Sequence, residues 1–126
     1  MRSPFLTLAA VAGFIGVAMG AFGAHGLKHV LSEHHLDVYK TAVSYQMWHA
    51  LLLALIGVLP AHKQLSWAGW LTTAGIVLFS GSLYLLAIFD LGWLGIITPF
   101  GGVAFLLAWG LLALTSFQYR QETDHG

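Results

Sequence analysis

Long apolar segments separated by short polar ones dominate the chain. The ten formal charges leave four uncharged stretches, and these contain 25, 22, 26 and 29 residues. Each is long enough for a helix of about 20 residues, the length that crosses a bilayer core of about 30 Å. Because backbone groups in lipid must bond within their own segment, helices are expected. The pattern predicts an all-α integral membrane bundle, a single domain over residues 1–126, with transmembrane helices at about 5–24, 41–60, 66–89 and 94–117.

Composition supports a membrane location. Hydrophobic residues make up 58% of the chain and charged residues only 8%, whereas a soluble surface is about a quarter charged. The net charge is zero, and no basic patch indicates a nucleic-acid partner. The chain has no cysteine, which excludes disulfides, thiolate metal sites and cysteine nucleophiles.

The segment ends carry aromatic anchors and a small charge bias. Aromatic rings with a polar edge favour the headgroup level, as expected for Trp67, Trp70, Trp93 and Tyr119. Four spans place both termini on one side of the membrane. That side carries Arg2, Lys63 and Arg120, against Lys28 and Lys40 on the other, which weakly favours cytoplasmic termini in the cell (inner) membrane.

Small residues recur along one face of the first helix, and small side chains let helices approach closely in lipid. The spacing leaves open whether the neighbour is another helix of the chain or a second subunit. The predicted helix-packing glycines are Gly13, Gly16, Gly20, Gly23, Gly81, Gly101 and Gly102.

The second helix carries a polar stripe. Ser32 is a candidate cap for a helix that begins at Glu33, and this helix can continue unbroken to Pro60. Positions recurring every three or four residues form one face, and polar groups on it should point into the bundle. The stripe comprises His35, Tyr39, Ala42, Gln46, His49 and Leu53, with Tyr45 beside it.

The third helix offers a matching polar face. Thr73, Ser80 and Tyr84 share one side, and Ser82 lies next to them. Two interpretations of these polar groups stay open. They form either a hydrogen-bond network between helices, or the path of an oligomeric small-solute or proton permease. The candidate polar bundle or solute site is His25, Tyr45, Gln46, His49, Ser80, Ser82 and Tyr84.

Histidines crowd the stretch "GAFGAHGLKHVLSEHH" at residues 20–35. Histidines and carboxylates bind zinc and similar metals, which makes His25, His29 and His35 weak candidates. Gly26 and the break near Ser32 spoil their alignment, so no metal site and no cofactor are predicted. We expect His25 to tie the first helix to the bundle. His29, His34 and His35 are expected along an amphipathic interfacial turn. Because histidine titrates near neutral pH, pH sensing is a third interpretation of these residues.

The start of the fourth helix has two interpretations. Thr98 followed by Pro99 is typical of a helix N-terminus. Alternatively, the helix begins near Trp93 and kinks at Pro99.

Four motifs resemble one family. They are "GAFGAHGL" (20–27), "YQMWHALLLAL" (45–55), "LFSGSLYLLAI" (78–88) and "GIITPFGGVAFLLAWGLL" (95–112). In order and spacing they are similar to the domain-of-unknown-function family numbered 423, whose eukaryotic relatives are called transmembrane protein 256. The resemblance implies a small four-helix membrane protein and no assigned reaction. Its matching positions include Gly20, Gly23, Ala24, His25, Tyr45, Gln46, His49, Ser80, Gly81, Ser82, Tyr84, Thr98, Pro99, Gly101 and Gly102.

The sequence thus predicts a noncatalytic membrane protein that associates with itself or with a membrane partner, surrounded by the lipid bilayer. The sequence shows no set of a nucleophile, a base and an orienting group, so no enzyme is predicted. The alternatives are the permease, which requires a wet cavity between the second and third helices, and metal binding by the loop histidines.

Overall fold

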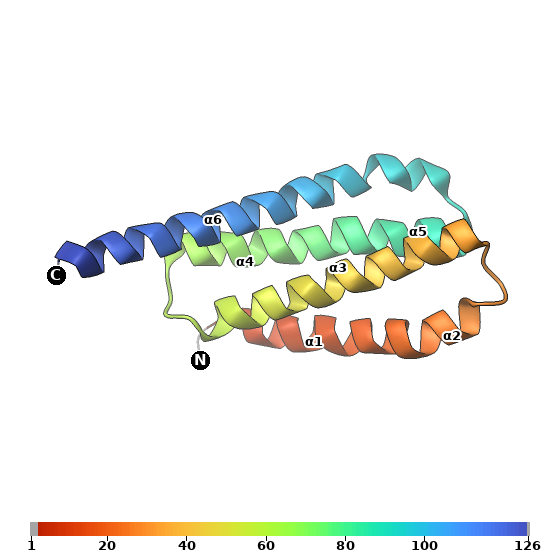
Figure 1. Cartoon of the computed structure of the whole chain (residues 1–126), viewed down its shortest axis with the longest axis horizontal. Helices are drawn as coiled ribbons and strands as arrows, with labels where there is room; N and C mark the ends of the chain where they lie inside the picture. The colour runs from red at the N-terminus through yellow and green to blue at the C-terminus, as the bar shows by residue number, and fades with distance from the viewer. Residues whose placement is uncertain (1–2, 126) are drawn as a thin grey trace.

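A computed structural model describes the backbone of residues 3–125 and the side chains of these residues, except those of residues 24 and 122–125. Four helical segments are long and apolar enough to cross a membrane, so the predicted all-α membrane bundle is confirmed. They run alternately up and down, with the start of the first and the end of the last at the same end of the bundle (Figure 1). The segments are Phe5–Leu27, Glu33–Val58, Lys63–Phe89 and Gly92–Gln121.

Three of the four segments change helix type along their length. The first comprises α1 (Phe5–Ala18), the π-helix η1 (Met19–Gly23) and α2 (Ala24–Leu27). The second is α3 (Glu33–Val58) alone. The third comprises α4 (Lys63–Gly75), the π-helix η2 (Ile76–Ser80) and α5 (Gly81–Phe89). The fourth comprises a 3-10 turn, η3 (Gly92–Ile96), and α6 (Thr98–His125).

Local capping fixes the ends of α3. The Ser32 side chain accepts a hydrogen bond from the His35 backbone N–H at 3.1 Å, which satisfies one of the free donors of a helix start. The helix stops at Val58 because Leu59, which precedes Pro60, is extended. The predicted Ser32 cap of a helix that begins at Glu33 is confirmed, and α3 starts well before position 41, where the apolar run suggested that the membrane span begins. His34 and His35, expected along an amphipathic interfacial turn, lie in the first turn of α3.

The beginning of the fourth segment follows the first sequence interpretation, a helix that starts at the Thr98–Pro99 pair. A 3-10 turn occupies Gly92–Ile96, and the α-helix starts at Thr98. Pro99 is in the first turn of α6, where its missing N–H costs no helical hydrogen bond. The connection before it begins at Asp90, whose φ of 57° is a left-handed conformation that Asp tolerates.

The α3 helix and the α4–α5 segment form the middle of the bundle. α3 packs against α1 on one side and against α4, η2 and α5 on the other, whereas α6 packs mainly against α4 and η2. α1 and α6 are therefore the outer helices, as Figure 1 shows. A core of apolar side chains joins them near the end that carries the termini; it comprises Phe5, Ala9, Leu52, Leu53, Ile56, Leu65, Ala68 and Ala108.

Glycines on α1 and η1 make the close contact with α3. A Cβ at Gly20 would lie 3.0 Å from Val43 Cγ1, and Cβ atoms at Gly16 and Gly23 would collide with Met47 and Tyr39. The neighbour of this glycine face is therefore a helix of the same chain. By contrast, Gly13 has no neighbouring atom within 4 Å of a Cβ position, and it lies on a lipid-facing groove of about 500 Å³ beside Phe14.

The glycines of the later helices differ in the same way. A Cβ at Gly101 would meet the backbone of Phe79, whereas Gly102 approaches only the Phe79 ring, at 4.0 Å. Gly81 has open space around its Cβ position. Gly101 therefore allows close packing of α6 on η2, and Gly81 and Gly13 are not points of close helix contact.

Candidate functional site

The polar stripe of α3 faces the interior of the bundle. Tyr39 and Ala42 are fully buried, and Gln46 and His49 are 3% and 4% exposed. Tyr45 is half-buried beside them. This is the face expected from the three- and four-residue spacing, and its polar atoms reach three other helical segments.

Tyr39 joins α3 to the π-helical part of the first segment. Its hydroxyl donates a hydrogen bond to the Met19 backbone carbonyl at 2.7 Å. A π-helix leaves a local irregularity in backbone bonding that a side chain can occupy. Gly23 is needed here because a Cβ at that position would collide with the Tyr39 hydroxyl.

Gln46 bridges the two neighbours of α3. Its amide nitrogen donates to the Ala12 carbonyl of α1 at 2.8 Å. Its amide oxygen accepts a hydrogen bond of 2.6 Å from the Tyr84 hydroxyl of α5. The Tyr84 ring also meets the Tyr39 ring edge-on at 5.4 Å. One side chain thereby fixes the position of α3 relative to α1 and α5.

Serines of the third segment form two further bridges. The fully buried Ser80 donates to the Ala42 carbonyl of α3 at 2.8 Å. The Ser82 hydroxyl lies 2.6 Å from the Thr98 hydroxyl at the start of α6. These contacts connect the third segment to the second and the fourth.

His49 is held between its own helix and α6. Its Nδ1 lies 2.7 Å from the Tyr45 carbonyl, and the Trp109 indole N–H donates to its Nε2 at 3.1 Å. An indole nitrogen only donates, so Nε2 accepts and Nδ1 carries the proton. The imidazole is thus neutral, and it stacks on the Phe105 ring with centroids 3.6 Å apart.

The interior network is complete in the part of the chain that the structure describes. Every buried side-chain nitrogen or oxygen there has a hydrogen-bond partner. Gln46, Ser80 and Tyr84 line none of the three grooves described here, which all open at the surface. These hydrogen bonds therefore hold the helices in position relative to one another, and the network presents no nucleophile paired with a base.

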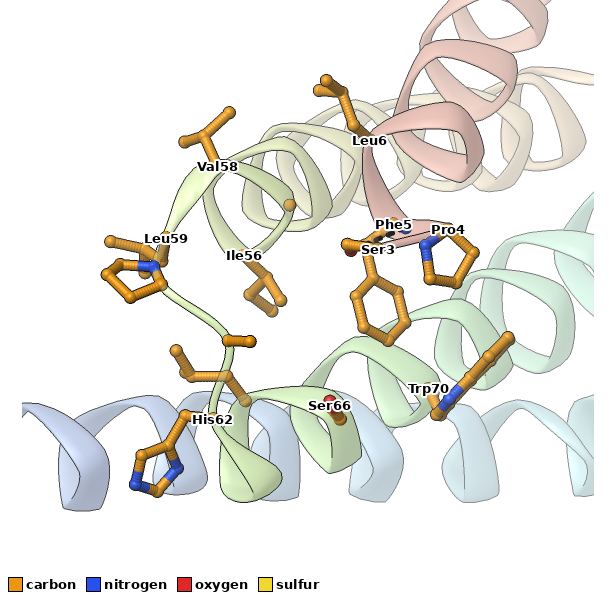
Figure 2. Close-up of a pocket in the computed structure, with 14 residues that line it drawn as sticks. Ser3, Pro4, Phe5, Leu6, Ile56, Val58, Leu59, His62, Ser66 and Trp70 are labelled. Carbon is orange, nitrogen blue, oxygen red and sulfur yellow. Dashed lines mark hydrogen bonds between the residues drawn. The ribbon is translucent and has the colours of Figure 1, made fainter. Parts of the chain in front are cut away.

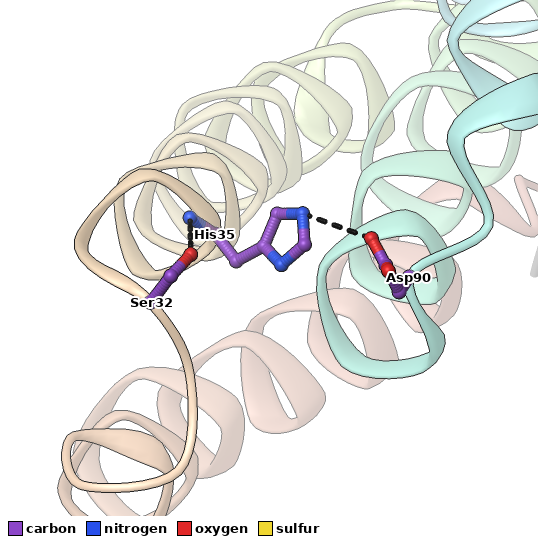
Figure 3. Close-up of polar contacts among 3 residues, drawn as sticks. All are labelled: Ser32, His35 and Asp90. Carbon is purple, nitrogen blue, oxygen red and sulfur yellow. Dashed lines mark hydrogen bonds and ion pairs between the residues drawn. The ribbon is translucent and has the colours of Figure 1, made fainter.

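The loop histidines lie apart from this network. His25, His29 and His34 are exposed, and His35 Nε2 lies 3.2 Å from an Asp90 carboxylate oxygen (Figure 3). This ion pair links the start of α3 to the end of α5. Among the side chains that the structure describes, those of residues 3–23 and 25–121, no three histidine or acidic groups come together in a way that would hold a metal ion. The predicted tie between His25 and the bundle is not seen, since His25 is on the surface.

A groove of about 890 Å³ opens at the end of the bundle near the termini, between the start of α1 and the α3–α4 connection. In Figure 2 the Phe5 ring points into it between the helices, whereas His62 lies at its margin. The Ser3 hydroxyl accepts from the Phe5 N–H, and His62 Nδ1 accepts from the Gln64 N–H. These two acceptors already bind backbone N–H groups, and the rest of the lining is mostly apolar, so this groove offers little for ligand recognition.

A second groove, of about 860 Å³, lies between α3 and α6 and faces lipid. We call it the aromatic groove, because five of its lining side chains are aromatic besides His49. It is lined by Tyr45, Trp48, His49, Leu51, Phe79, Pro99, Gly102, Val103, Phe105, Leu106 and Trp109. Sequence reasoning identified Tyr45 and His49 but missed Trp48, Phe79, Phe105 and Trp109. A signal was present: Trp48 and Trp109 lie in the interior of long helices, away from the interface positions that tryptophan favours.

Comparison with known proteins agrees with the motif resemblance. The family described as "Protein of unknown function (DUF423)" matches residues 19–102. A UPF0382 membrane protein of Staphylococcus aureus (strain bovine RF122 / ET3-1) is 45% identical over 117 residues, which cover 91% of this chain and 96% of the relative. The UPF0382 membrane protein YwdK of Bacillus subtilis (strain 168) is 44% identical over 120 residues, covering 91% and 97%. No solved structure matches the chain.

Proposed function

The chain belongs to the DUF423 family of membrane proteins, and we propose that it is a noncatalytic membrane protein that binds a partner within the plane of the bilayer. No activity is assigned to the family, so the proposal is based on the structure. The observation that carries the proposal is how the polar side chains are used. Every buried polar side chain that the structure describes already has a hydrogen-bond partner, whereas large aromatic side chains of the aromatic groove are exposed. Trp48 and Trp109, for example, are 56% and 45% exposed.

The alternatives have less support. A permease built on Gln46, Ser80 and Tyr84 needs water along these groups, but each is bonded to a neighbouring helix. Metal binding needs converging ligands, and the described residues provide no such group. Catalysis needs a nucleophile beside a base, and His49, the one buried histidine of the described chain, has both nitrogens engaged.

The partner is a second copy of the chain, another membrane protein, or a membrane-soluble small molecule. A photo-crosslinking amino acid at Leu106 tests this, because that side chain lines the groove and is 73% exposed. Leu114 is the matched control on the same helix, 45% exposed and outside the groove. We expect an adduct of discrete mass from position 106 that position 114 does not give. The same diffuse lipid adducts at both positions would refute the proposal.

We also propose that the protein resides in the cell inner membrane with both termini in the cytoplasm. Supporting this, the start of α1 and the end of α6 lie at the same end of the bundle (Figure 1). In the sequence, three basic residues flank the helix ends of that side, Arg2, Lys63 and Arg120, against Lys28 and Lys40 on the other side. Positive charge favours the cytoplasmic side. A C-terminal fusion to green fluorescent protein should fluoresce and one to alkaline phosphatase should be inactive. The reverse pattern would contradict this orientation.

A further inference from the structure

We propose that the aromatic groove binds a neutral, membrane-soluble molecule that carries a flat conjugated ring and a hydrogen-bond acceptor, as a quinone-type ring does. This rests on the proposed function, since it specifies the partner of the same groove. Three features of the groove carry the inference: its walls, one tyrosine hydroxyl, and the absence of charge.

The walls suit a flat ring. The Tyr45 ring lies 4.5 Å from the Phe79 ring and 5.0 Å from the Trp48 ring, centroid to centroid. Phe105 closes the floor by stacking on His49. Aromatic rings gain most from offset stacking or edge contacts with other rings. From Pro99 to Trp109 the groove extends along α6 for about 15 Å, at 1.5 Å per residue, which accommodates a ring followed by an apolar tail.

The Tyr45 hydroxyl supplies the polar signal. The hydroxyls of Tyr39 and Tyr84 each donate to a group of a neighbouring helix, whereas the hydroxyl of Tyr45 makes no hydrogen bond with the described part of the chain. Tyr45 lies at the middle of the 26-residue α3, far from either end. Since the bilayer core holds no water to bond this group, an acceptor on a bound molecule would satisfy it.

The lining indicates a neutral ligand. No lysine, arginine, aspartate or glutamate lines the groove, so neither an anionic headgroup nor a metal ion has a counter-charge there. His49 has both nitrogens occupied. A lipid acyl chain carries no acceptor for the Tyr45 hydroxyl, and a helix of a second copy presents backbone carbonyls that are already bonded. A ring with a carbonyl matches both the walls and the free donor.

Decylubiquinone, a benzoquinone ring with a ten-carbon tail, is the probe. The chain has five tryptophans, and replacing Trp67, Trp70 and Trp93 with Phe leaves Trp48 and Trp109 in the groove as fluorophores. With the protein in lipid nanodiscs, we expect saturable quenching of their fluorescence. Decylbenzene, which has the same tail and a flat ring but no acceptor, should not displace the probe.

Two variants and one control locate the binding. Tyr45→Phe removes only the hydroxyl and should weaken affinity about tenfold, the effect of one buried hydrogen bond. Tyr84→Phe, the matched control, loses a hydroxyl used inside the bundle and should leave affinity unchanged. Val103→Phe fills the groove and should abolish saturation while the helical circular dichroism persists.

Several results would overturn the inference. These are quenching that rises linearly with the quinone content of the lipid, equal affinity in Tyr45→Phe, and displacement by decylbenzene. A discrete protein adduct from position 106 without quinone binding would refute this inference and leave the proposed function intact. Failure of both experiments would refute both.

Discussion

The substitution Gly101→Ala tests how closely α6 packs on the third segment. An added Cβ at this position would strike the Phe79 backbone nitrogen, with Phe79 Cβ and Cα only 2.7 and 2.8 Å away. Backbone atoms cannot turn aside as a flexible side chain can, so the two helical segments would have to separate. Since Phe79 lines the aromatic groove, this contact also sets the shape of the groove.

The magnitude follows from two opposing effects. Alanine in place of glycine inside a helix gains about 0.5–1 kcal/mol in backbone entropy. Overpacking a close contact costs about 1–3 kcal/mol, and more where backbone meets backbone. Because the collision here is with backbone, the cost lies in the upper part of this range, and less the entropy gain we expect Gly101→Ala to lower the free energy of unfolding by about 1–2 kcal/mol. Gly102→Ala, whose added Cβ would come no closer to a neighbour than 4.0 Å from the Phe79 ring, should be neutral or slightly stabilising.

The assay is reversible unfolding in mixed micelles with increasing dodecyl sulfate, followed by circular dichroism. Gly110→Ala is a second control, because nothing lies within 4 Å of its Cβ position. If Gly101→Ala unfolds at the same dodecyl sulfate fraction as Gly102→Ala, α6 does not approach η2 as closely as described, and the reasoning about the groove fails with it.

Three further predictions concern polar contacts. A double-mutant cycle of Gln46→Leu and Tyr84→Phe in the same assay should give a coupling free energy of about 1 kcal/mol. The reason is that the two side chains share one hydrogen bond between helices. Additive effects of the two substitutions would contradict this bond. ¹⁵N NMR should show His49 protonated at Nδ1 and not at Nε2. Trp109→Phe should shift the Nε2 resonance and lower the free energy of unfolding by about 1 kcal/mol, because it removes the indole hydrogen bond. Protonation at Nε2 would rule out that bond. The coupling free energy between His35→Gln and Asp90→Asn should be less than about 1 kcal/mol, because the Asp90 side chain is 82% exposed. A coupling above about 2 kcal/mol would mean that the contact between the two side chains is shielded from solvent.

The number of spans and the inward face of α3 could be predicted from the sequence because both depend on local pattern. Charges mark the ends of apolar runs, and the spacing of Tyr39, Gln46 and His49 defines a helix face whatever it packs against. The exact ends could not be read from hydropathy. The start of α3 lies in a polar stretch outside the apolar run, and capping chemistry indicates it instead: Ser32, the predicted cap, accepts a hydrogen bond from the His35 N–H.

The aromatic groove could not be predicted because it depends on residues far apart in the chain. Trp109 reaches His49 across 60 positions, and no local pattern relates them. The two π-helices and the open space around Gly13 and Gly81 likewise depend on how complete helices pack against each other. Glycine spacing indicated a close helix contact, but which glycines make it is decided by tertiary packing.

The most direct measurement of the structural role of the interior network is water access to Ser80. Because the chain has no cysteine, Ser80→Cys and Val30→Cys each provide a single thiol, one fully buried and one in the exposed connection before α3. Both are treated in membranes with a charged, water-soluble thiol reagent. A binding protein braced by its polar stripe should be labelled at position 30 and left unlabelled at position 80. Labelling of position 80 at a rate close to that of position 30 would show a water path between the helices and contradict this function.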